Sequence, residues 1–101
     1  MTLENAKKRP ALLLSHVAMG SRIHLWTVAM ITSQVDGLRF EGDIVLEDWR
    51  QCHLLHPSLV RLSKIATLEG SLLEKQLGRL SSRDMGEVKR VWKQLYRFWL
   101  D

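Results

Sequence analysis

The chain has 101 residues, which is enough for one domain that buries about 65% of its unfolded surface but excludes a second domain. Its composition, 46% hydrophobic and 26% charged residues without a Pro- or Gly-rich tract, excludes a disordered or low-complexity chain. The formal net charge of +4 favours a polyanionic partner such as RNA or DNA.

The sequence also argues against export and against a membrane. Cys52 is the only cysteine, so no intrachain disulfide can form, and we expect a reducing, cytoplasmic location. The basic residues 7–9 precede an apolar run as in a secretory signal, but Ser15 and His16 end that run too early. No apolar window approaches the roughly 18 residues that cross a bilayer, so we expect no membrane partner.

The first part of the chain predicts two strands joined by a loop. Pro10 leads into residues 11–15, ALLLS, a short apolar run typical of a strand buried on both faces. Residues 16–23 contain Gly and Ser at their centre and predict a loop. Residues 24–32, HLWTVAMIT, are rich in β-branched and aromatic side chains and predict a long second strand.

The middle of the chain predicts further short strands. A connector with an Asp-Gly turn signal covers residues 33–43 and leads into a third strand over residues 43–47. Residues 48–57 predict a loop or a single helical turn that ends at a proline. Residues 58–68 predict one or two more strands, and residues 74–80 a last short one.

The C-terminal region changes to a helical period. Apolar residues at steps of three and four predict one face of a helix over residues 82–100: Met85, Val88, Val91, Trp92, Leu95 and Trp99. Ser81 is placed to be the N-cap, with Asp84 as the acid of a capping box. The opposite face carries Lys89, Lys93 and Arg97, which form either a solvated stripe or a contact to RNA or an acidic partner.

Together these elements predict a mainly β fold with a C-terminal α-helix, built on a small twisted or half-closed antiparallel sheet. An open sheet leaves edge strands that dimerisation commonly covers. Trp92, Phe98 and Trp99 add more apolar surface than such a sheet can cover. We therefore expect a homodimer in which the helix and a sheet edge are partly buried.

Pairing of the first two strands would bring Arg9 and Thr32 to the same end of a hairpin. With a turn near residues 19–21, Arg9 lies opposite Ile31 or, one step along, opposite Thr32. Directly opposed residues have Cα atoms about 4.5–5.5 Å apart, close enough for a guanidinium and a hydroxyl to hold one phosphate. A one-residue slip turns Thr32 to the other face, which leaves a surface arginine and an ordinary strand end as the alternative.

Several segments carry a resemblance to a known family. KKRPALLLS, AMITSQ and LGRLSSRDMGEVKRVWKQL occur in this order, with EDWRQCHLL and PSLVRLSKIATLE between the last two. Together they resemble the MazF/PemK-like toxins, the ribosome-independent mRNA endonucleases of type II toxin–antitoxin modules. The resemblance covers residues 8–101, and the Trp-containing segment with the Ser-Leu-Val-Arg strand is similar to the PemK-like branch.

The resemblance implies a MazF/PemK/CcdB-like fold, a compact SH3-like barrel or sheet with a C-terminal helix, in one domain over residues 1–101. It implies a homodimer, cleavage of single-stranded RNA without metal or cofactor, and inhibition by an antitoxin whose acidic tail occupies the RNA groove. Arg9 matches the family's catalytic arginine and Thr32 its catalytic threonine. The candidate RNA-binding residues are Lys7, Lys8, Ser15, Ser33 and Gln34.

These residue types suit the chemistry. Attack of a 2′-hydroxyl on the adjacent phosphate builds negative charge on the phosphorane oxygens, and preorganised N–H donors stabilise that charge. Arg9 stays protonated, so we favour transition-state stabilisation over a role as general base. Thr32 would add one hydrogen bond. His16 and His24 are available as a base, but a lone histidine at a strand start or in a loop is more often structural or exposed.

Two other constellations are weaker. Cys52, His53 and His56 could begin a zinc site, yet a structural site normally needs four ligands and the chain has no second cysteine. We therefore expect no metal. Trp26, Trp49, Trp92 and Trp99 could stack on bases. All except Trp49 occupy apolar-periodic positions, which favours core or dimer interface for those three.

The family ordinarily carries a first strand and a long loop ahead of its Arg-Pro dipeptide. The six residues before Lys7 are too few for both, so we expect an N-terminally short domain with an open groove, lower stability and weak or no cleavage. The alternative to an endoribonuclease is a non-catalytic binding module that keeps the dimer and antitoxin or RNA-binding surfaces. Cleavage of single-stranded RNA to 2′,3′-cyclic phosphate ends separates the two.

Overall fold

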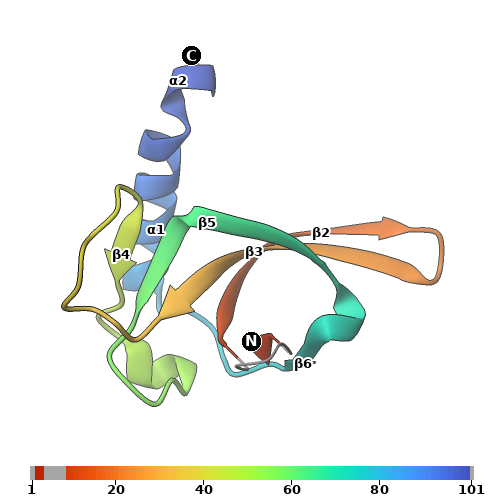
Figure 1. The fold of residues 1–101 in the computed structure, drawn as a ribbon, viewed down its shortest axis with the longest axis horizontal. Helices are drawn as coiled ribbons and strands as arrows, with labels where there is room; N and C mark the ends of the chain where they lie inside the picture. Colours follow the sequence, from red (N-terminus) through yellow and green to blue (C-terminus); the bar gives the residue numbers. More distant parts are fainter. Residues whose placement is uncertain (1, 4–8, 101) are drawn as a thin grey trace.

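The computed structural model describes residues 2–3 and 9–100, and its strands form two antiparallel sheets (Figure 1). The larger sheet has the order β2 (Ala11–Met19), β3 (Ile23–Thr32), β5 (Leu59–Glu69) and β4 (Asp43–Val45). The smaller sheet pairs β1 (Thr2–Leu3) with β6 (Leu73–Lys75). The larger sheet curls into a half-barrel, and helix α1 (Ser82–Leu95) follows it, with a short α2 (Arg97–Leu100) at its end. The predicted mainly β fold with a C-terminal helix is confirmed.

The β2–β3 hairpin is longer than the sequence pattern predicts. Residues 16–23, expected to form a loop, are strand on both sides of a tight turn at Gly20, whose φ of +69° lies in the region that glycine adopts freely. Cross-strand side-chain contacts explain the difference. His16 Nε2 lies 2.8 Å from His24 Nδ1, and the His16 ring also packs on Trp26. The two histidines therefore hold the hairpin that reaches away from the body in Figure 1.

The strands of the middle region differ in length from their predictions. Residues 58–68 form a single strand, β5, and the helical turn expected within residues 48–57 is present as η1 (Trp49–Cys52). A strand was expected over residues 74–80, but β6 ends at Lys75 and the prediction is wrong for residues 76–80. The backbone of this segment packs against η1 and does not pair with another strand. A Cβ on Gly78 would lie 3.2 Å from the Cα of Cys52.

The N-terminal segment contributes a strand of two residues, β1, although we expected the residues before Lys7 to be too few for a strand and a loop together. The pairing places Thr2 against Lys75 and Leu3 against Leu73. This short pair joins the start of the chain to the segment that follows β5.

The two faces of the larger sheet carry separate cores. One face packs against α1 through a buried cluster: Ala29, Ile31, Ile44, Leu46, Val60, Leu62 and Val88. The other face buries Ala11 and Val28, with Trp26 packed against them. A bulge in β2 between Leu13 and Ser15 shifts the register against β3. Because of these two cores the paired end of the hairpin, where β2 begins and β3 ends, is rigidly held.

Helix α1 begins as predicted. The Ser81 side chain accepts a hydrogen bond from the Asp84 N–H at 3.1 Å, so Ser81 is the N-cap. Val88 is buried, and Met85 and Leu95 are half-buried on the same face. The helix ends at Leu95 rather than running on to residue 100, and α2 follows after a break. Neither helix in the described part of the chain is both long and apolar enough to cross a membrane.

Asp84 does not act as the acid of a capping box. Its side chain is buried, with 2% exposure, and its two carboxylate oxygens accept hydrogen bonds from the backbone N–H groups of Glu47 and Asp48, both at 2.9 Å. Asp48 in turn accepts from the Ser81 hydroxyl at 2.6 Å. The first turn of α1 is thus tied to the segment between β4 and η1, which fixes the helix on the sheet.

The helix end and the loop before β4 expose large apolar side chains. Phe98 is 85% exposed and Trp92 37%, and Trp92 stacks on Tyr96 with ring centroids 4.2 Å apart. Leu38 and Phe40, in the loop between β3 and β4, are 87% and 53% exposed. In Figure 1 the helix extends past the edge of the sheet beside this loop. Trp92 and Phe98 belong to the surface expected to lie in a dimer interface, and the loop with Leu38 and Phe40 was not part of that expectation.

Candidate functional site

A pocket of about 830 Å³ opens where β2 begins and β3 ends. Ala11 faces Met30 in the ladder, and the Ile31 N–H donates to the Pro10 carbonyl at 3.3 Å. Continuing this register by one residue puts Arg9 opposite Thr32. This extrapolated register is one of the two alignments that the sequence leaves open, and it brings Arg9 and Thr32 to the same end of the hairpin.

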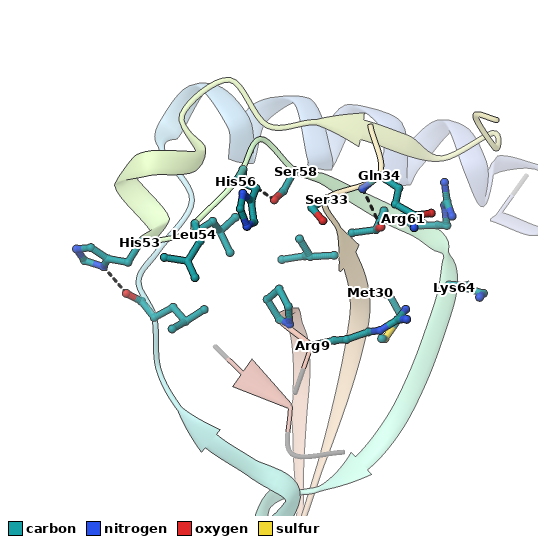
Figure 2. A pocket seen from close by; sticks show the side chains of 15 residues that line it. Arg9, Met30, Ser33, Gln34, His53, Leu54, His56, Ser58, Arg61 and Lys64 are labelled. Atoms are coloured by element: carbon teal, nitrogen blue, oxygen red, sulfur yellow. Dashed lines mark hydrogen bonds between the residues drawn. The ribbon is translucent and has the colours of Figure 1, made fainter. Parts of the chain in front are cut away.

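Four of the predicted site residues line the pocket, one from the start of β2 and three from the end of β3. Arg9 lies at the entry to β2, Thr32 ends β3, and Ser33 and Gln34 follow it, and all four line the pocket (Figure 2). Of the remaining candidates, Ser15 is exposed on β2 opposite Thr27 and does not line this pocket. Lys7 and Lys8 lie outside the described residues.

The Thr32 hydroxyl has a fixed orientation. It accepts a hydrogen bond from the Gln34 N–H at 3.1 Å, across the turn in which β3 ends. A hydroxyl that accepts one bond still has its own hydrogen to donate. That hydrogen is available to an oxygen atom of a ligand in the pocket, while Gln34 itself stays exposed beside it.

The rest of the pocket is lined by polar residues that the sequence motifs did not indicate. They come from the loop after η1 and from β5, and they are His53, His56, Ser58, Arg61 and Lys64. Ser58, Arg61 and Lys64 are three residues apart, so regular strand alternation would not place them on one face. They reach one pocket because the pairing of β5 with β3 shifts register between Ala29 and Met30, and no local sequence signal indicates that shift. With Arg9 they make the pocket basic, which suits an anionic ligand.

Arg61 is held by a buried partner. Its Nε and Nη2 donate to the two Asp43 carboxylate oxygens at 2.9 and 3.0 Å, and its guanidinium lies 4.4 Å from the centre of the Phe40 ring. Burial opposes ionisation of Asp43, but hydrogen bonds from Arg61 and from the Phe40 N–H outweigh it, so the pKa of Asp43 falls below its usual value. Arg61 is thereby oriented, with its charge compensated by Asp43.

The residues of the weaker zinc hypothesis point apart. The Cys52 thiol is buried against the Arg79 carbonyl at 3.4 Å, and burial raises its pKa. His53 forms a hydrogen bond to the Leu77 carbonyl, while the His56 ring reaches into the pocket (Figure 2). In the described ranges 2–3 and 9–100, no three His, Cys, Asp or Glu side chains cluster as a metal ion would require.

The fold and pocket together define a small antiparallel half-barrel with a C-terminal helix and a basic pocket at one end of its central hairpin. The chain matches the family of PemK-like, MazF-like toxins of type II toxin–antitoxin systems over residues 2–96, and it belongs to this family. No curated protein matches it. The resemblance carried by the sequence motifs is confirmed, and the family implies an antitoxin as partner.

Proposed function

We propose that the protein is the toxin of a type II toxin–antitoxin module and cleaves single-stranded mRNA in the cytoplasm, without metal or cofactor. The observation that carries the proposal is that Arg9, at the entry to β2, and Thr32, at the end of β3, line the same basic pocket. An arginine fork beside a donating hydroxyl matches the oxygens of one phosphate. The cognate antitoxin would block this pocket with an acidic segment, because such a segment presents similar charge.

In the proposed reaction the 2′-oxygen attacks the adjacent phosphorus and the bond to the 5′-oxygen breaks, leaving a 2′,3′-cyclic phosphate and a 5′-hydroxyl. Arg9 donates its N–H groups to the oxygens on which negative charge develops. Thr32 adds one hydrogen bond from the hydroxyl that the Gln34 N–H holds in place. Lys64 extends the positive wall along which neighbouring phosphates lie.

The test is an endpoint analysis of a labelled single-stranded RNA incubated with the purified protein in EDTA. We expect slow but detectable formation of fragments with 2′,3′-cyclic phosphate ends, and none from duplex RNA of the same sequence. The Arg9→Ala variant is the control for a contaminating nuclease. Salt-sensitive RNA binding with no cleavage by the unmodified protein would contradict the proposal and favour the non-catalytic binding module.

Thr32 variants separate the hydroxyl from the shape of the side chain. We expect Thr32→Ser to retain most of the cleavage rate, because serine keeps the hydroxyl, and Thr32→Val to lose about 10²- to 10³-fold, as expected for one donor aimed at developing charge. Single-turnover cleavage rates measure both. Equal loss in the two variants would show that side-chain shape, rather than the hydroxyl, matters at this position.

We also propose that two copies associate through the helix end and the loop before β4. Trp92, Phe98 and Phe40 expose more apolar surface there than a monomer normally leaves in water. Light scattering at micromolar concentration should give about twice 11.7 kDa. Phe98→Glu should shift the mass toward one copy, whereas Val17→Glu, on the hairpin, should not. A clean monomer of the unmodified protein would refute the proposal.

A further inference from the structure

We infer that His56 is the general acid of this pocket, the group that protonates the departing 5′-oxygen of the RNA. The inference rests on the proposed RNA cleavage and assigns its missing proton donor. Arg9 and Thr32 stabilise charge, but neither supplies a proton to a leaving alkoxide near neutral pH. A third group is therefore needed, and it has to lie across the phosphate from Arg9.

His56 occupies that position. The ladder pairs Thr32 with Leu59, three residues after His56, so the register between β3 and β5 sets the His56 loop beside the end of β3. Figure 2 shows the His56 ring pointing from this loop into the pocket, on the opposite side from Arg9. In an in-line displacement the leaving oxygen lies at an end of the reacting axis, away from the equatorial oxygens that an arginine holds.

The His56 backbone is fixed on its C-terminal side. Pro57 follows it and restricts its backbone to an extended conformation. Ser58 is 4% exposed, and its hydroxyl donates to the His56 carbonyl at 2.8 Å. The hydrogen bond from this buried hydroxyl and the following proline fix the backbone from which the His56 side chain projects toward the pocket, and a fixed position favours proton transfer.

The other lining residues do not fit the role. Imidazole is the only side chain that ordinarily gains and loses a proton near neutral pH, and of the described residues that line the pocket only His53 and His56 carry one. The His53 ring is held by the Leu77 carbonyl at the rim and turns away from the pocket centre (Figure 2). His16 and His24 lie on the far part of the hairpin and bond to each other.

The 2′-oxygen forms its bond to phosphorus and loses its proton to water, while the bond between phosphorus and the 5′-oxygen breaks and its electron pair stays on that oxygen. The His56 imidazolium gives its proton to the 5′-oxygen and becomes neutral imidazole. Proton exchange with water restores the imidazolium before the next turnover.

The experiment uses two RNAs of one sequence, one ordinary and one with sulfur in place of the 5′-oxygen at the cleaved linkage. A thiolate leaves without a proton donor, because alkyl thiols ionise at about pH 8.5. On ordinary RNA we expect His56→Gln to cleave about 10²-fold or more slowly than the parent protein, the usual size of a general-acid effect. On the sulfur-substituted RNA the two proteins should differ by less than about threefold.

His24→Gln is the matched control, since it removes an exposed imidazole outside the pocket and should cleave both RNAs at the parent rate. Thermal unfolding checks that His56→Gln is folded. Parent-like cleavage of ordinary RNA by His56→Gln, or an equal defect on both RNAs, would overturn the inference while leaving the proposed function intact. Absence of cleavage of either RNA by the parent protein would refute both.

Discussion

Replacing Arg9 with lysine is expected to abolish RNA cleavage nearly as completely as replacing it with alanine, with a loss of about 10²- to 10³-fold or more in each variant. Lysine keeps the positive charge but presents a point charge in place of the planar fork that grips two oxygens of one phosphate. Single-turnover rates on a short single-stranded RNA measure the effect, and salt titrations of binding should show that the Arg9→Lys variant still binds.

The control is Arg90→Lys, on an exposed face of α1 where Arg90 pairs with Glu87. It should cleave at the parent rate. Cleavage by Arg9→Ala that approaches the parent rate would place the reacting phosphate elsewhere and would contradict the proposed site. A large loss for alanine with a small loss for lysine would show that charge alone is sufficient.

Replacing Asp84 with alanine is expected to lower the free energy of unfolding by roughly 3 kcal/mol, because the backbone N–H groups of Glu47 and Asp48 would lose their shared, buried acceptor. That is a large part of the roughly 5–15 kcal/mol that a domain of this size has in total. Asp84→Asn keeps one acceptor oxygen and should lose about half as much. Urea denaturation measures all three proteins.

Asp36→Ala is the control for this series, since Asp36 is exposed in a turn and its loss should change stability by less than about 0.5 kcal/mol. An Asp84→Ala variant as stable as the control would show that water or a backbone shift satisfies the N–H groups of Glu47 and Asp48. The junction between α1 and the β4–η1 segment would then contribute little to the fold.

Local sequence signals predicted the elements whose stability is local. Apolar spacing indicated the face of α1 that carries Val88, and Ser81 was identified as its cap because capping involves residues only three positions apart. The role of Asp84 could not be predicted in this way, since its partners lie 36 and 37 residues away in sequence. The length of the hairpin was missed because His16 and His24 look polar until they pair across strands.

In the candidate site, too, the residues set by local structure could be predicted and those set by distant pairing could not. Arg9 and Thr32 belong to one hairpin and to the family motifs, so the sequence predicted that they lie at the same end of that hairpin. The wall that holds His56 and Lys64 depends on how β5 pairs with β3, including a register shift between Ala29 and Met30. No local pattern fixes such a shift, so this half of the pocket required the structure.

The pairing of Thr32 with Leu59 also determines when the pocket can be completed during synthesis of the chain. A nascent chain that has left the ribosome only as far as the β2–β3 hairpin has formed one wall of the pocket. The residues contributed by β5 are positioned only when β5 pairs with β3, and such pairing between segments distant in sequence forms more slowly than a hairpin. The pocket is therefore incomplete until β5 has been synthesised and has paired with β3. Under the proposed function, a nascent chain could not cleave RNA before that point.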